Sequence, residues 1–240
     1  MSPTPPRGPL GASDPGRPVR TAQRRADLLC TAALGALGGS VVLGLPPQER
    51  TFAAVVAPVQ LSMSLLVPLV GILLASDLRR ARPAPGRRLV LPAVLGALLA
   101  AELLAVVGIL LAALAVVLAP TTAPDRWRAA GLLVVGSLLT QVVAVLTGTG
   151  FGLLVPSRTL AFGLTLLPAP LWLALGVAGP ARAVRHWILP YGAARHLLGG
   201  TMTAASWGQV VVVLALWGVG LNALGVRRLD RSLAGQPPAG

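Results

Sequence analysis

The residues that could do chemistry are few and scattered. The chain has 240 residues, of which only seven are Asp or Glu, two are His and one is Cys. Metal binding and acid–base catalysis need clusters of such side chains. His186 and His196 have no carboxylate between them, and Cys30 stands alone in an apolar stretch. We therefore predict no catalytic residue, no metal site and no cofactor bound by this chain.

A glycine-rich stretch, Gly148-Thr149-Gly150-Phe151-Gly152, has the composition of a nucleotide-binding loop but not its context. It follows no predicted strand, and the chain has no lysine to complete a phosphate loop. We interpret these glycines as sites of close helix packing. The sequence thus predicts a protein that is not an enzyme and does not hydrolyse ATP by itself.

Long apolar stretches dominate the rest of the chain. Hydrophobic residues make up 55% of the sequence and charged residues only 11%. About 20 apolar residues suffice for a helix to cross a bilayer. The pattern predicts an all-α, polytopic membrane protein with a six-helix transmembrane domain over residues 26–228. The predicted spans are 28–45, 52–76, 89–119, 130–150, 160–177 and 208–226, flanked by a disordered tail (1–25) and a short tail (229–240).

Arginines choose the orientation of this domain. All twenty basic residues are Arg, and fourteen of them lie on the side that also holds both termini. By the positive-inside rule this side is the cytoplasm. The clusters flank apolar spans, so we expect them to face lipid headgroups rather than nucleic acid. The Arg-, Ala- and Gly-rich composition suggests a bacterial plasma membrane protein.

Polar residues within the spans are the remaining candidates for function. Glu102, Gln60 and Gln141 are candidate positions on a substrate path, because polar groups at membrane depth usually face protein or water. Alternatively, Glu102 lies near the interface, and the glutamines form hydrogen bonds between helices. Pro58 and Pro68 predict kinks in the second span. Residues 179–207 are too polar to span and should form an outer segment with a short helix that Pro190 opens and Gly199-Gly200 closes.

One segment between the second and third spans combines charge with proline. Asp77, Arg79-Arg80, Arg82 and Arg87-Arg88 surround Pro83 and Pro85 just before a long apolar run. Further along, Ser157-Arg158 follows the glycines, Leu189-Pro190 opens the outer helix, and Arg227-Arg228 closes the last span. In this order and spacing the chain resembles the membrane subunit of ABC-2 type transporters over about residues 20–232.

This resemblance implies a function and partners. Such permeases pair with a second permease copy or a paralogue, and a separate ATP-binding cassette subunit binds ATP and Mg on the cytoplasmic side. Asp77, Arg79, Arg80, Arg82, Arg87 and Arg88 would then dock that ATPase, and the chain would form the path for export of a hydrophobic or amphipathic substrate. The alternative is a non-transporting integral membrane scaffold or assembly protein.

Overall fold

The computed structural model describes residues 17–80, 87–177, 179 and 181–234, and all its regular elements there are helical. Within these residues six helical stretches are long and apolar enough to cross a membrane. This confirms the predicted all-α, multi-pass class. The six stretches are Arg25–Gly44, Phe52–Arg80, Leu91–Leu118, Ala130–Leu154, Arg158–Val177 and Ala204–Arg231.

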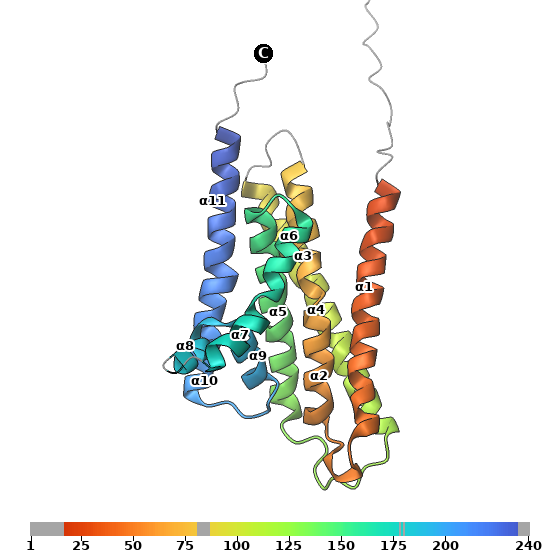
Figure 1. Ribbon diagram of the computed structural model, residues 1–240. Coiled ribbons are helices and arrows are strands. Elements are labelled where there is room, and N and C mark those ends of the chain that lie inside the picture. The colour runs from red at the N-terminus through yellow and green to blue at the C-terminus, as the bar shows by residue number, and fades with distance from the viewer. Residues whose placement is uncertain (1–16, 81–86, 178, 180, 235–240) are drawn as a thin grey trace, which may run out of the picture.

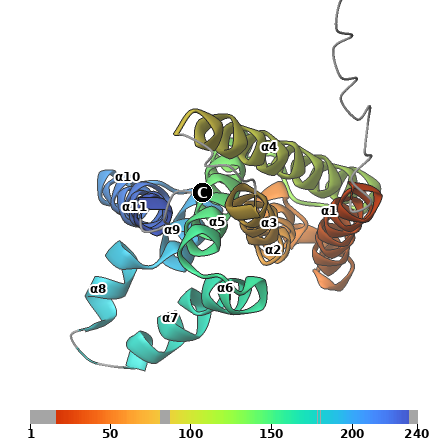
Figure 2. The same ribbon diagram turned by 90° about the horizontal axis from the view of Figure 1, so that it is seen from above.

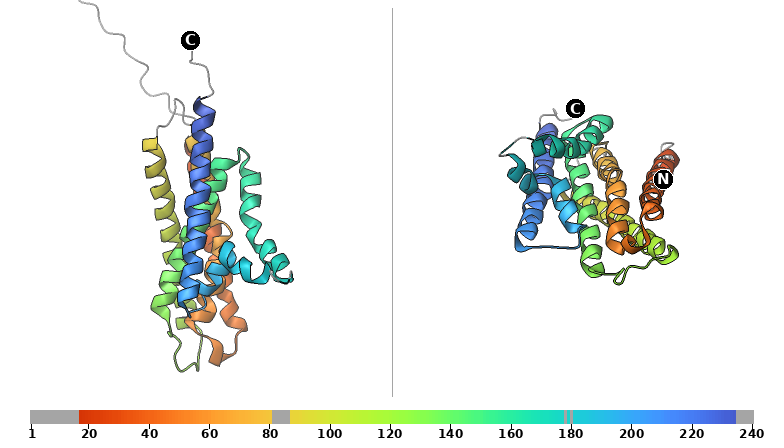
Figure 3. Two further views of the ribbon diagram at one scale, coloured as in Figure 1. Left: turned by 90° about the vertical axis from the view of Figure 1, so that its left-hand side faces the viewer. Right: turned by 60° about the horizontal axis from the view of Figure 1, so that its bottom comes forward.

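The helices stand side by side, and several of their ends gather at one end of the molecule (Figure 1). The start of α1 (Arg17–Gly39), the end of α3 (Val67–Arg80), the turn between α5 and α6, and the end of α11 (Leu221–Ala234) all lie at this upper end. Figure 3 shows the same arrangement from the side. The start of the first helix and the end of the last described helix therefore lie on the same side, as an even number of crossings requires.

The first helix is longer than the apolar pattern predicts. α1 begins at Arg17, inside the predicted tail of residues 1–25, and residues 1–16 lie outside the described residues. Arg, Gln and Ala have high helix propensity, and from Val19 to Leu34 neither Gly nor Pro interrupts them. A 3-10 turn, Ser40–Gly44, follows α1, and another, Pro47–Glu49, lies in the connection to the next helix.

The second crossing is broken once. α2 (Phe52–Ser64) starts where Thr51 Oγ1 accepts a hydrogen bond from Ala54 N, and it runs unbroken past Pro58. It ends before Leu65-Leu66, and α3 begins at Val67, so Pro68 lies in the first turn of the new helix. Proline is tolerated there because no intrahelical donor is lost. Of the two proline positions, the interruption therefore falls at Pro68.

α5 (Ala130–Leu154) is the central helix. It contacts α2, α3, α4 (Arg87–Leu118), α9 (Pro190–Leu197) and α11, and Figure 2 shows it between α11 and α3. The predicted role of its glycines is confirmed. A Cβ at Gly148 would meet the backbone of Pro68, and one at Gly152 would meet that of Ile72. α3 and α5 therefore pack backbone against backbone.

The last two crossings are interrupted helices joined by short ones. α6 (Arg158–Leu166) and α7 (Pro168–Val177) divide the fifth, and α10 (Ala204–Val213), a π-helical stretch (Leu214–Gly220) and α11 form the sixth. Between them lie α8 (Ala181–Ile188) and α9 (Pro190–Leu197). α9 opens at Pro190 and ends before Gly200, whose φ is +71°, which confirms the short helix predicted between Pro190 and Gly199-Gly200.

Candidate functional site

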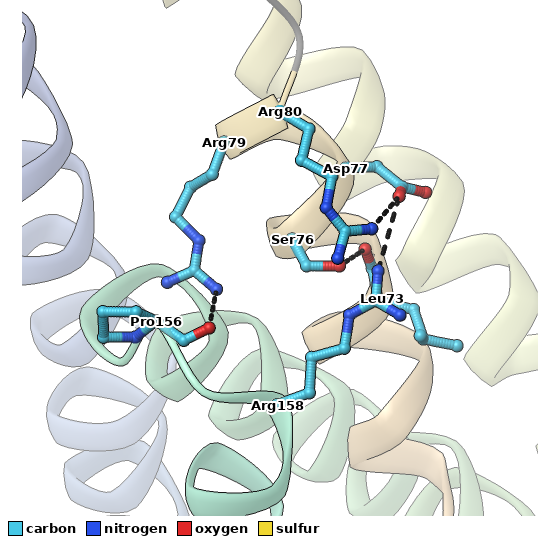
Figure 4. Close-up of polar contacts among 7 residues, drawn as sticks. All are labelled: Leu73, Ser76, Asp77, Arg79, Arg80, Pro156 and Arg158. Atoms are coloured by element: carbon cyan, nitrogen blue, oxygen red, sulfur yellow. Dashed lines mark hydrogen bonds and ion pairs between the residues drawn. The ribbon is translucent and has the colours of Figure 1, made fainter.

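At the upper end, Arg79 ties α3 to the turn between α5 and α6 (Figure 4). Its guanidinium donates hydrogen bonds to Val155 O at 2.5 Å and to Pro156 O at 3.2 Å. Val155 is the C-terminal cap residue of α5, where backbone carbonyls have no helical partner. A single arginine thus joins the last turn of one helix to the exit of another.

Asp77 makes a second link in the same place. Its carboxylate Oδ1 lies 3.9 Å from Arg158 Nη2, in the first turn of α6, and 4.0 Å from Arg80 Nη1 on its own helix. The Asp77 side chain is 24% exposed and that of Arg80 is 56% exposed. Ser157 Oγ caps α6 by accepting a hydrogen bond from Leu160 N. Asp77 therefore connects α3 to a helix start that is already fixed.

Positive charge accumulates around these links. The charges of Arg80, Arg158 and Arg228 all lie close enough to act on that of Arg79. Of the other predicted docking residues, Arg87 and Arg88 open α4, and Arg82 lies outside the described residues. We call Asp77, Arg79, Arg80 and Arg158 the end cluster. Sequence reasoning did not assign Arg158 to it, because nearly eighty residues separate Arg158 from Arg79.

The two glutamines of the predicted path are in contact. Gln141 Nε2 on α5 donates to Gln60 O at 3.1 Å and to Gln60 Oε1 at 2.8 Å, and Gln60 Nε2 donates to Ala105 O on α4 at 2.9 Å. Both side chains are fully buried. Gly108 makes room, because a Cβ there would meet the Gln60 amide. This geometry favours the alternative interpretation, hydrogen bonding between helices.

Glu102 does not take part in this pair. It is half-buried on α4, next to the face that carries Ala101 and Ala105, and the hydrogen bonds of the glutamines do not include it. The three predicted path residues therefore do not form one polar site. Gln60 and Gln141 lie at the contact of α2, α4 and α5, and none of the three residues lines the space described next.

A cavity of about 110 Å³ lies where two broken helices face each other. It is bounded by the α2–α3 break, α5, the α6–α7 break and α9. Its serine and threonine hydroxyls donate to carbonyls of their own helices, as Thr140 does to Gly136 O and Thr165 to Phe162 O. Residues lining it include Leu61, Ser64, Leu65, Pro68, Thr140, Val143, Ala144, Thr147, Thr165, Leu166, Pro168, Ala169, Tyr191, Ala194 and Leu197.

The cavity fits an apolar or amphipathic molecule. Most of its lining is hydrocarbon, and its few hydroxyl oxygens retain acceptor capacity after donating to the backbone. Sequence reasoning missed this site because the site depends on two helix breaks meeting in space. The only signal in the sequence is a proline at each break, Pro68 and Pro168.

An aromatic group lies beside the cavity, and its Tyr191 is one of the lining residues. The ring of Trp172 lies 4.6 Å from that of His186 and 5.6 Å from that of Tyr191, between centroids, and the guanidinium carbon of Arg185 lies 4.3 Å from its centroid. Arg185 also donates to Trp172 O at 3.0 Å. These contacts hold α7 against α8 and α9, so we call Trp172, Arg185, His186 and Tyr191 the outer group.

Electrostatics in the outer group favour neutral His186. Burial lowers the pKa of the His186 imidazole, and the positive charges of Arg185, His196 and Arg195 lower it further. The rings of His186 and His196 are 5.7 Å apart between centroids. Among the described residues, no three His, Cys, Asp or Glu side chains gather where they could hold a metal ion.

Comparison with known proteins gives no relative. No model of a protein family, no curated protein and no solved structure matches this chain. Its function must therefore be argued from its own geometry.

Proposed function

We propose that this chain is the membrane subunit of an ABC-2 type exporter in a bacterial plasma membrane. In this proposal the upper end of Figure 1 is cytoplasmic, and a separate ATP-binding cassette subunit supplies ATP hydrolysis. A second permease copy or a paralogue completes the path, and the substrate is hydrophobic or amphipathic. Six apolar spans with both described ends on one side support this arrangement.

One observation carries the proposal. The segment that begins at Asp77 is joined to the start of α6 by side chains of the end cluster. Along the chain, α6 leads from that cluster to the α6–α7 break that lines the cavity. A partner that pulls on Asp77 and Arg79 would therefore act on one wall of the cavity through their contacts with Arg158, Val155 and Pro156.

Mechanical coupling of this kind needs one pair of helices that moves as a rigid unit and a second pair that can move relative to each other. α3 and α5 pack so closely that they move together, whereas the fifth crossing is divided at Leu167. Movement of the end cluster would tilt α6 against α7 and change the size of the cavity. Rigid-body shifts of packed helices between discrete states are a common form of such switching.

The experiment separates docking from coupling. The chain is purified together with the ATPase subunit encoded by the adjacent gene, and both ATPase retention and lipid-soluble dye export from vesicles are measured. Arg80→Glu with Arg88→Glu should abolish retention, since the Arg80 side chain is 56% exposed and its contact with Asp77 lies within its own helix. Arg79→Gln should keep the ATPase bound but reduce export, because its bonds to Val155 and Pro156 are lost.

Arg128→Glu is the matched control. Arg128 is exposed in the connection before α5 and should change neither measurement. Retention of the ATPase by the Arg80/Arg88 double variant would refute docking at this segment. If no ATPase is encoded nearby and none co-purifies, the scaffold alternative gains the support that the transporter proposal loses.

A further inference from the structure

A groove opens on the lipid-facing side between the lower parts of α1 and α4. It has a volume of about 340 Å³ and lies at the end of the molecule opposite the end cluster. Its rims are apolar and strongly exposed: Leu43 is 76% exposed and Leu118 is 72% exposed. In a membrane, hydrocarbon must contact these surfaces.

Small residues form the floor of the groove. Ala36 and Gly39 of α1 line it together with Ala115 of α4 and Ala119, which follows α4. Small residues usually allow two membrane helices to touch closely. In this groove α1 and α4 leave a space between them, because α1 ends at Gly39 and the chain continues as a 3-10 turn. The space that remains is long and apolar, as an acyl chain requires.

Arg50 also lines this groove. Its Nε donates to Leu45 O at 2.9 Å and one Nη donates to Pro120 O at 2.8 Å. An arginine carries five N–H donors, so three remain without a partner among the described residues. The two backbone bonds hold the guanidinium in place, and its unused donors and its charge are complementary to a phosphate.

We propose that this groove binds one phospholipid of the leaflet at this end, with an acyl chain on Ala36 and Ala115 and its phosphate on Arg50. The inference is independent of the transport proposal. The lipid would fill the gap between α1 and α4 and tie the connections at residues 45–51 and 119–120 together through Arg50. No covalent step is involved.

Native mass spectrometry of the full chain in detergent tests the site. The probes are palmitoyl-oleoyl phosphatidylglycerol, the matching diacylglycerol, and glycerol phosphate without chains. Phosphatidylglycerol should bind with one-to-one stoichiometry. Arg50→Gln should weaken it on the order of tenfold, as expected for loss of charge-assisted hydrogen bonds. Ala36→Phe, which fills the groove with a ring, should weaken it by a similar factor.

Two variants serve as controls. Ala33→Phe places the same ring on an exposed position of α1 outside the groove, and Arg128→Gln removes an exposed arginine at the same end. Both should bind phosphatidylglycerol like the unaltered protein. Because Arg50 also holds the 45–51 connection, the Ala36→Phe result is an independent reading that does not disturb that connection.

Several results would overturn the proposal. Unchanged binding in both Arg50→Gln and Ala36→Phe would show that lipid sits elsewhere. Equal binding of diacylglycerol would remove the role of the phosphate, and equal binding of glycerol phosphate would make this a small-anion site. A dimer that Ala36→Phe dissociates, in a protein that retains no lipid, would show that a second copy covers the groove.

Discussion

The α3–α5 contact and the α6–α9 flank of this protein are packed in opposite ways. In the apolar part of the Phe52–Arg80 span half of the residues are buried inside the protein, against 17% in that of Arg158–Val177. The α3–α5 contact uses glycines that bring two backbones together, whereas the flank consists of short helices around a cavity. The difference shows where the protein resists movement and where it can yield.

The largest effect on stability is expected when a side chain is added at the close contact between α3 and α5. Gly148→Leu should destabilise the protein by about 3 kcal/mol or more, because the new side chain meets the backbone of Pro68. The measurement is the thermal unfolding midpoint in detergent. Gly163→Leu on α6 is the control, since no heavy atom lies within 4 Å of a Cβ there. Equal unfolding midpoints for the two variants would contradict the proposed difference in packing between the α3–α5 contact and the α6–α9 flank.

The buried amide pair should show the next largest effect. Gln141→Leu removes two donors to Gln60 and leaves the Gln60 side-chain oxygen without a partner, at a cost of about 1–2 kcal/mol. A double-mutant cycle with Gln60→Leu measures the coupling in the same unfolding assay. Gln209→Leu is the matched control, because its buried Oε1 has no partner to lose. Zero coupling in the cycle would argue against the pair.

A smaller effect is expected where the flank is attached to the last crossing. Trp217 Nε1 donates to Ile188 O at 2.7 Å, so Trp217→Phe should cost about 1 kcal/mol. Limited proteolysis near residue 188 should accelerate while global unfolding shifts little, since the flank is attached at its rim. Trp187→Phe, which replaces an exposed ring of α8, should leave proteolysis unchanged. A uniform loss of stability would indicate that the flank and the tight contact unfold together.

The smallest effect is a pH dependence confined to the flank. The pKa of His186 is lowered below its ordinary value of 6.5 in the folded protein. The unfolded chain therefore takes up a proton first, and stability falls as the pH drops from about 6.5 through the lowered pKa. His186→Gln should remove this fall, while Gly148 and Gln141 variants should retain it. Unfolding curves between pH 5 and pH 7.5 check this. If stability depends on pH in His186→Gln as it does in the unaltered protein, His186 is not the cause of the fall.

The sequence predicts those parts of the fold that depend on local composition. The six spans follow from apolar run length, and the outer helix follows from Pro190 and the glycines after Leu197. The α6–α7 break and the cavity escape such reasoning, because they depend on which helices meet in space. The partners of Arg79 escape it too, since two backbone carbonyls carry no signal in a sequence.

The predicted substrate path shows the same limit. Gln60 and Gln141 are polar at membrane depth, and a sequence cannot tell whether such side chains meet each other or a substrate. The structure brings them together, and neither of them lines the mainly apolar cavity. Glu102 shares neither location, so its role stays a prediction.

The π-helical stretch Leu214–Gly220 has more residues per turn than an α-helix, so the last helix would lengthen if this stretch rewound into α-helix. Asn222 Nδ2 donates to Gly218 O and to Leu146 O, and so satisfies a carbonyl within this wider winding. If one residue passed from the π stretch into regular α geometry, everything beyond it would turn by about 100° and advance by about 1.5 Å. Because Leu221 packs on Gly150 and Gly225 packs on Leu153, α11 would then have to repack against α5, and the arginines at its end would point in a new direction.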